Sequence, residues 1–141
     1  MALITNIQST ISNEIPMSNF RIENKKFDLE ERTMKFGRSV IALTKKVYES
    51  SVTRPLITQL VRSATSIGAN YCEADNAESR KDFKHKISIC RKESKETKHW
   101  LNMLMEAVPA HHQDLKVLLQ EATELTLIFN AIVNSTISNS H

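Results

Sequence analysis

Apolar residues recur every three or four positions along four long segments of this chain of 141 residues. That spacing lines up one apolar stripe on an α-helix, whereas a half-buried β-strand requires strict alternation. Only two Gly and three Pro are available for tight turns, which disfavours a sheet protein with many turns. Short connections between long helices return the chain antiparallel. We therefore expect an all-α fold, namely an antiparallel up-down-up-down four-helix bundle.

Residues typical of helix ends mark the limits of the four segments. Asp28 with Glu31, and Ser79 with Asp82, are each three positions apart, as in a capping box. Pro55 is tolerated in a first turn because an amide there has no intrahelical acceptor. The predicted helices begin at Asp28, Thr53, Ser79 and about His112, and they end near Ser50, Asn76, Pro109 and Ile137.

The apolar stripes predict which side chains point inward. The expected core comprises Leu29, Phe36, Val40, Leu43, Val47, Leu56, Leu60, Ala64, Ile67, Tyr71, Phe83, Ile87, Cys90, Ser94, Thr97, Leu101, Leu104, Leu115, Leu118, Ala122, Leu125, Phe129 and Ile132. Gly68 interrupts the second helix at a cost of about 1 kcal/mol relative to alanine, which suggests a steric reason for the glycine.

A second set of apolar residues falls outside these stripes. Its members are Met34, Ile41, Tyr48, Ile57, Val61, Ile89 and Trp100. A four-helix core cannot cover all of them, so we expect this second stripe to bury against another copy of the protein. The alternative is a broad core face with scattered exposed residues.

The length suits one domain, and we expect residues 27–138 to form it, with residues 1–26 as a mobile N-terminal tail. Residues 1–20 contain no Lys or Arg, and no stretch approaches the roughly 18 apolar residues that span a bilayer. Neither a secretion signal nor a membrane partner is therefore predicted. Cys72 and Cys90 form no CxxC motif, and we interpret them as reduced packing residues of a cytoplasmic protein. A disulfide between them is the less favoured alternative.

Positive charge is concentrated on the third segment. Residues 79–105 hold eight Lys or Arg against three acids, a net charge of +5, whereas residues 106–141 hold one Lys against four acids, a net charge of −3. Five of these cations share one helix face: Lys81, Lys84, Arg91, Lys95 and Lys98. Such a line can displace counterions from a phosphate backbone and bind it largely independently of sequence. The plainer alternative is a solvated helix face.

Three stretches of the sequence, residues 66–74, 78–87 and 91–101, resemble those of a known family. It is the family of bacterial four-helix-bundle proteins encoded by intervening sequences inside 23S ribosomal RNA genes, and the resemblance covers roughly residues 28–132. The chain is also similar, more distantly, to the accessory variability determinant of diversity-generating retroelements, a pentameric basic bundle that works with RNA and a reverse transcriptase. The resemblance implies a homo-oligomer, commonly a ring of five, with a nucleic-acid-associated role. Cys72 and residues 75–76 depart from the usual pattern, and the segment before Lys26 has no counterpart.

Catalytic and metal-binding patterns are incomplete. Glu96 and His99 fit one Glu-x-x-His pattern, but a di-iron bundle needs a second copy of it. The two histidines that open the fourth segment fit a polar helix start better than a metal site. Gly37 and Gly68 are too far apart to form a phosphate-cradling loop. We therefore expect no enzyme, no metal, no cofactor and no small-molecule substrate.

The residues and the resemblance together predict a non-enzymatic oligomeric accessory protein. We expect it to bind nucleic acid, with RNA favoured, through the basic face of the third helix. Base-stacking aromatics do not accompany that face, so binding should depend on backbone and shape. The alternative is a structural or protein-interaction oligomer whose basic helix docks an acidic protein partner.

Overall fold

The computed structural model describes residues 26–138 and the side chains of residues 29–136. Over this range the chain forms four α-helices: α3 (Lys26–Thr44), α4 (Thr53–Asp75), α5 (Arg80–Ala107) and α6 (His112–Ser138). A single 3-10 turn, η1 (Pro109–His111), precedes α6. These residues contain no strand, so the predicted all-α class is confirmed. The predicted mobile tail, residues 1–26, lies outside the described residues except for Lys26.

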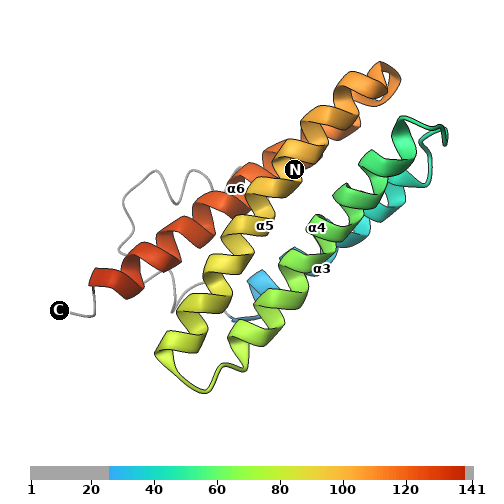
Figure 1. Cartoon of the computed structure of the whole chain (residues 1–141). Coiled ribbons are helices and arrows are strands. Elements are labelled where there is room, and N and C mark those ends of the chain that lie inside the picture. Colours follow the sequence, from blue (N-terminus) through green and yellow to red (C-terminus); the bar gives the residue numbers. More distant parts are fainter. Residues whose placement is uncertain (1–25, 139–141) are drawn as a thin grey trace.

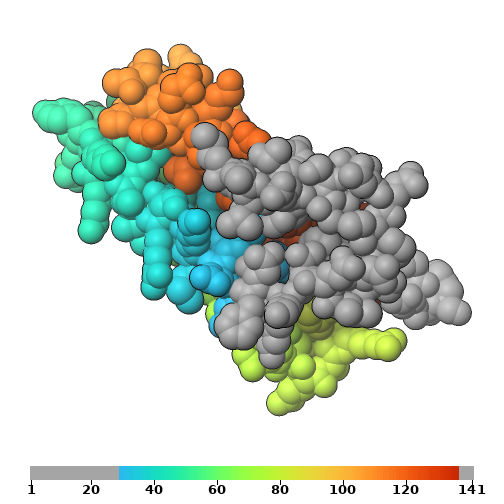
Figure 2. All heavy atoms as spheres, turned by 180° about the vertical axis from the view of Figure 1, so that it is seen from behind, coloured from blue at the N-terminus to red at the C-terminus, as the bar shows by residue number. Residues whose placement is uncertain are grey.

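The four helices lie side by side, and the chain reverses its direction at each connection (Figure 1). The closest neighbours are α4 with α5 and α5 with α6, followed by α3 with α4, while α3 and α6 meet least closely. Seen from behind, side chains of α3 and of the start of α6 lie next to each other on one face (Figure 2). None of the described helices is long and apolar enough to cross a bilayer.

Most helix ends match the predicted ones. The Ser79 side chain accepts a hydrogen bond from the Asp82 amide at 3.0 Å, which caps the start of α5 as expected. Asn76 is the C-terminal cap of α4. The first helix starts at Lys26, two residues before Asp28, whose side chain lies outside the described set.

The end of α3 differs from the prediction because the helix stops at Thr44, six residues before Ser50. The amides of Lys46 and Val47 bond to carbonyls three residues back, which tightens the chain out of the α-helix. Thr53 Oγ1 then accepts from the Ser50 amide at 2.9 Å and donates to the Tyr48 carbonyl at 2.8 Å. Tyr48 therefore lies in the connection and does not continue the α3 face.

The predicted core is confirmed. All of its members are buried except Leu56 and Phe83, which are half-buried and pack against it. The Cys90 thiol is fully buried, and its Sγ donates to the Ile67 carbonyl at 3.6 Å. Cys72 is exposed, so the prediction that both cysteines are packing residues is wrong for Cys72. Cys72 lines a groove on the surface between α3 and α4.

Helices α3 and α4 approach each other at Gly68. A Cβ added there would lie 3.4 Å from Thr33 Oγ1 and 3.6 Å from the Thr33 carbonyl carbon. These are van der Waals distances, so α3 would accept an alanine at this position. The expected steric reason for Gly68 is therefore not supplied by the packing of α3 against α4.

A buried ion-pair cluster joins α3 to α6. Arg32 Nε donates to Glu121 Oε1 at 2.8 Å, and Arg32 Nη2 donates to Glu124 Oε2 at 3.0 Å. The three side chains are 9%, 12% and 1% exposed. Burial, with the charge of Glu121, raises the pKa of Glu124, and Arg32 opposes that rise. The least closely packed of the neighbouring helix pairs is thus connected by ion pairs.

Candidate nucleic-acid interface

The five cations predicted to contact phosphate lie along α5, the longest helix of the described chain. One side of α5 is anchored in the core by apolar and small polar residues, among them Ile87, Cys90 and Leu101. Because an α-helix repeats every 3.6 residues, the cations share a face outside this buried side. Lys81 and Lys95 are exposed, and Lys84, Arg91 and Lys98 are half-buried. From the first to the last they cover roughly 25 Å at 1.5 Å per residue.

None of the five cations forms an ion pair with another described residue. Two acids of α5 lie on the side facing α4, where Arg62 pairs with both Glu93 and Glu96. Another cation of α5, Lys86, pairs with Glu73 of α4. The surface of α5 therefore divides into a side neutralised by α4 and a side with uncompensated positive charge.

The α4–α5 ion pairs also change the titration of their members. The hydrogen bond to Glu96 raises the pKa of Arg62, and the hydrogen bond to Glu73 raises the pKa of Lys86. Burial acts to raise the pKa of Glu96, but hydrogen bonds from Arg62 and from Trp100 Nε1 outweigh it and lower that pKa. Glu96 is thus engaged across helices and does not face a bundle interior, where a di-iron site would need it.

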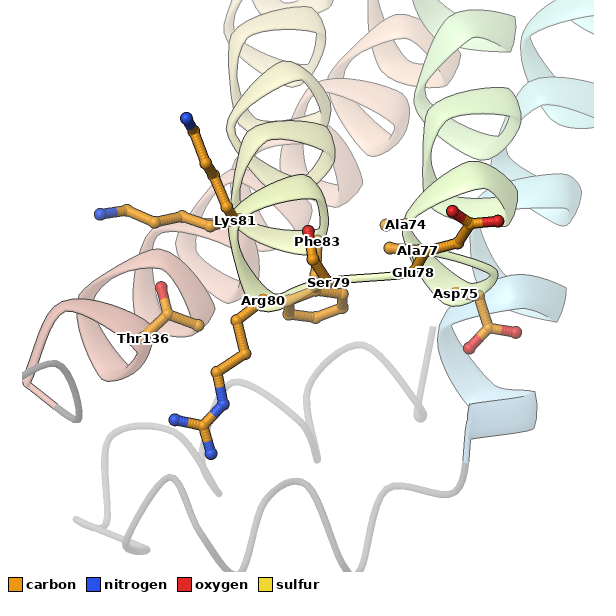
Figure 3. Close-up of a pocket in the computed structure, with 10 residues that line it drawn as sticks. Ala74, Asp75, Ala77, Glu78, Ser79, Arg80, Lys81, Phe83 and Thr136 are labelled. Carbon is orange, nitrogen blue, oxygen red and sulfur yellow. The ribbon is translucent and has the colours of Figure 1, made fainter.

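A hollow of about 740 Å³ adjoins the N-terminal end of the cation line, at the α4–α5 turn (Figure 3). The hollow is lined by the basic residues Arg80, Lys81 and Lys84, by the acids Asp75 and Glu78, and by the ring of Phe83. In Figure 3 the side chain of Lys81 extends away from the Phe83 ring. Because its charges are mixed and do not converge, the hollow by itself does not define an anion site. Among the described residues no three His, Cys, Asp or Glu side chains gather as metal ligands would.

The predicted self-association residues fall into two groups. Met34, Ile41 and Tyr48 are exposed, at 47%, 37% and 84%. Met34 and Ile41 border a shallow groove of about 290 Å³ between α3 and α4, whose floor includes Gly37 and Gly68. The second group is half-buried and comprises Ile57, Val61, Ile89 and Trp100. Three of these, Ile57, Val61 and Trp100, pack against the core. Only the first group presents large free apolar surface.

Sequence reasoning missed two features. One is the Arg32 cluster, although a signal was available: Glu121 and Glu124 are three residues apart, and no other charge occurs in residues 117–138. The other is the exposure of apolar side chains on α5 and α6, at Met103, Val117 and Leu127. Apolar periodicity alone could not show that these three side chains are exposed. A residue at the edge of an apolar stripe is buried or exposed according to how the neighbouring helix packs.

Comparison with known proteins gives a family and a fold. A family model described as 23S rRNA-intervening sequence protein matches residues 25–131. The chain is similar to a solved structure from Bacteroides thetaiotaomicron, described as a protein with unknown function from the S23 ribosomal protein family. The two are 29% identical with a TM-score of 0.70, and the match covers 78% of this chain and 98% of that chain. No curated protein matches the chain.

Proposed function

Because the chain belongs to the 23S rRNA-intervening sequence protein family, we propose that it is a non-enzymatic, oligomeric accessory protein that binds nucleic acid. RNA is the favoured ligand, in keeping with the genes for which the family is named, and the cytoplasm is the favoured location. The ligand lies along the cation line of α5, defined as Lys81, Lys84, Arg91, Lys95 and Lys98.

One observation carries this proposal: five aligned cations have no acid partner among the described residues, although acids are present on the same helix. Pairing in the fold would have reduced their attraction for a polyanion. When unpaired cations bind a phosphate backbone, they release the counterions condensed on it, and this release favours binding. The aromatic side chains of α5, Phe83 and Trp100, are partly buried against the core, so recognition rests on the backbone and its shape.

Self-association is the second part of the proposal. It is supported by the exposure of Met34 and Ile41 on α3 and of Tyr48 in the connection that follows, since large exposed apolar side chains favour burial against a partner. We take the helices as an antiparallel up-down-up-down four-helix bundle, in keeping with the chain reversals in Figure 1. A ring of five, as the family resemblance implies, would bring several cation lines together and add their fields.

The salt dependence of binding tests the cation line. Five phosphate contacts give a slope of log affinity against log salt of about −4.5 on a duplex and about −3.5 on a single strand. Replacing Lys84, Arg91 and Lys95 by Gln leaves two contacts, so the slopes should fall to about −1.8 and −1.4. Fluorescence anisotropy with labelled RNA, titrated at several salt concentrations, measures both slopes.

A matched control removes the same charge elsewhere. Lys35, Lys45 and Lys46 are exposed and lie on α3 or just after it, and their replacement by Gln should leave the slope unchanged. Equal slopes in the α5 and α3 triple variants would refute the assignment of the cation line. Tight binding of an acidic protein, with no measurable RNA binding at low salt, would favour the alternative of a protein-interaction oligomer.

A further inference from the structure

The exposed side of α3 combines apolar and charged side chains along one row. Met34 is 47% exposed, and Ile41, about two turns further along the helix, is 37% exposed. Glu30 and Arg38 are exposed as well, and all four side chains line the groove between α3 and α4. Large apolar side chains beside a groove, with charges around them, are typical of a surface that another molecule covers.

The two charged side chains of this row, Glu30 and Arg38, form no ion pair with a described residue. They are eight residues apart on α3, or roughly 12 Å at 1.5 Å per residue, which is too far for them to pair with each other. Arg32, by contrast, is committed to the two glutamates of α6. The groove therefore offers a partner one unpaired acid and one unpaired base at a fixed separation.

Met34 lies midway between these two charges. Glu30 comes four residues before it and Arg38 four residues after it, so each charge is about 6 Å from Met34 along the helix, and all three share one face. A second copy of α3, laid antiparallel on this face about a two-fold axis at Met34, has its Arg38 opposite Glu30 and its Glu30 opposite Arg38. Over residues 29–39 this register brings no two like charges opposite each other. The face is therefore complementary in charge to itself.

We propose that two copies of this chain pair through α3, antiparallel about a two-fold axis at Met34. The two Met34 side chains bury against each other and the α3–α4 grooves, while the two Glu30–Arg38 pairs set direction and register. A parallel arrangement would instead bring like charges together. The inference rests on the self-association in the proposed function and specifies its contact. A two-fold contact joins subunits in pairs, so the assembly contains an even number of chains, and a ring of five would pair with a second ring.

Cysteine cross-linking of the full chain checks the position of the axis. Cys72 is first replaced by Ser, and Cys90 stays unreactive because it is fully buried and burial raises its pKa to about 12. A disulfide requires Cα atoms about 4.4–6.8 Å apart, a separation that two identical residues reach only beside the axis. Oxidation of Met34→Cys with copper phenanthroline should therefore give a covalent dimer, whereas Asn102→Cys, exposed on α5, should not. Failure of Met34→Cys to cross-link would overturn the proposal.

Exchanging the two charges tests the pairing itself. Glu30→Arg alone, or Arg38→Glu alone, places like charges opposite each other at both ends of the contact and should weaken the association by at least about tenfold. The double variant restores both pairs with reversed polarity and should recover the wild-type association. Sedimentation equilibrium measures the mass, which should halve in each single variant. Glu106→Arg, which makes the same charge change at an exposed position of α5, is the matched control and should leave the mass unchanged.

The masses separate failure of this contact from failure of self-association. A wild-type protein that stays a single chain at every concentration measured would refute both. An oligomer that keeps its mass in the Glu30→Arg and Arg38→Glu variants would refute the α3 contact alone, and a double variant that stays dissociated would overturn the pairing of Glu30 with Arg38. Both side chains are exposed, so circular dichroism should show wild-type helix content in all variants.

Discussion

Replacing Arg32 by Met should be among the most damaging single changes in this protein. The substitution removes a guanidinium that is 9% exposed and leaves the carboxylates of Glu121 and Glu124 facing each other in the interior. Glu124, at 1% exposure, would then have neither a counterion nor access to water. Breaking a buried ion pair in this way costs about 3–5 kcal/mol of the free energy of unfolding. That is a large fraction of the roughly 5–15 kcal/mol that a domain possesses.

The same variant should show a distinctive pH dependence. Burial already raises the pKa of Glu124 above its ordinary value of 4.5, and loss of Arg32 removes the opposing effect. A carboxyl group with a raised folded-state pKa binds its proton more tightly in the folded state than in the unfolded state. Stability therefore increases as the pH falls from 7 toward about 4.5, so the deficit of the variant should shrink on acidification.

Urea denaturation followed by circular dichroism at pH 7 and pH 5 measures both effects. Arg54→Met is the matched control because its ion pair with Glu49 is exposed and is worth at most about 1 kcal/mol. A triple variant in which Met replaces Arg32 and Leu replaces Glu121 and Glu124 should recover most of the lost stability. If Arg32→Met cost less than about 1 kcal/mol at pH 7, or if its deficit grew on acidification, the assignment of a buried cluster would be wrong.

Two smaller changes test the helix contacts. Gly68→Ala should raise the free energy of unfolding by roughly 0.5–1 kcal/mol through helix propensity, because its Cβ would meet Thr33 only at 3.4 Å or more. Thermal melting measures this change. Gly37→Ala is the control, because the nearest atom to a Cβ at position 37 would be 3.8 Å away. A loss of stability in Gly68→Ala alone would mean that α3 cannot accommodate the methyl group. Ser79→Ala should lower the free energy of unfolding by about 1 kcal/mol, because it removes the side-chain cap of α5. Ser51→Ala, at an exposed position, is the control and should leave that free energy unchanged. Equal melting temperatures of the two variants would contradict the role of the cap.

The four helices and their core follow from local patterns in the sequence. The three-and-four spacing of apolar residues is a local property, and it identifies the inward stripes from Leu29 to Ile132 without reference to the neighbouring helices. Capping is local too, so the start of α5 at Ser79 was predictable. The end of α3 was not, because a Thr53 side chain from the next helix fixes the connection that replaces its last turn.

Which charged side chains form ion pairs depends instead on how the helices pack together. Helical spacing puts Lys84 on the shared cation face and Lys86 outside it, but it does not show that Glu73 of α4 pairs with Lys86 while Lys84 forms no ion pair with a described residue. Likewise Arg32 lies about 90 residues before Glu121 and Glu124 in the chain and meets them only because α3 and α6 are neighbours. Ion pairing depends on distances of a few ångströms between helices, and a periodic pattern within one helix does not encode those distances.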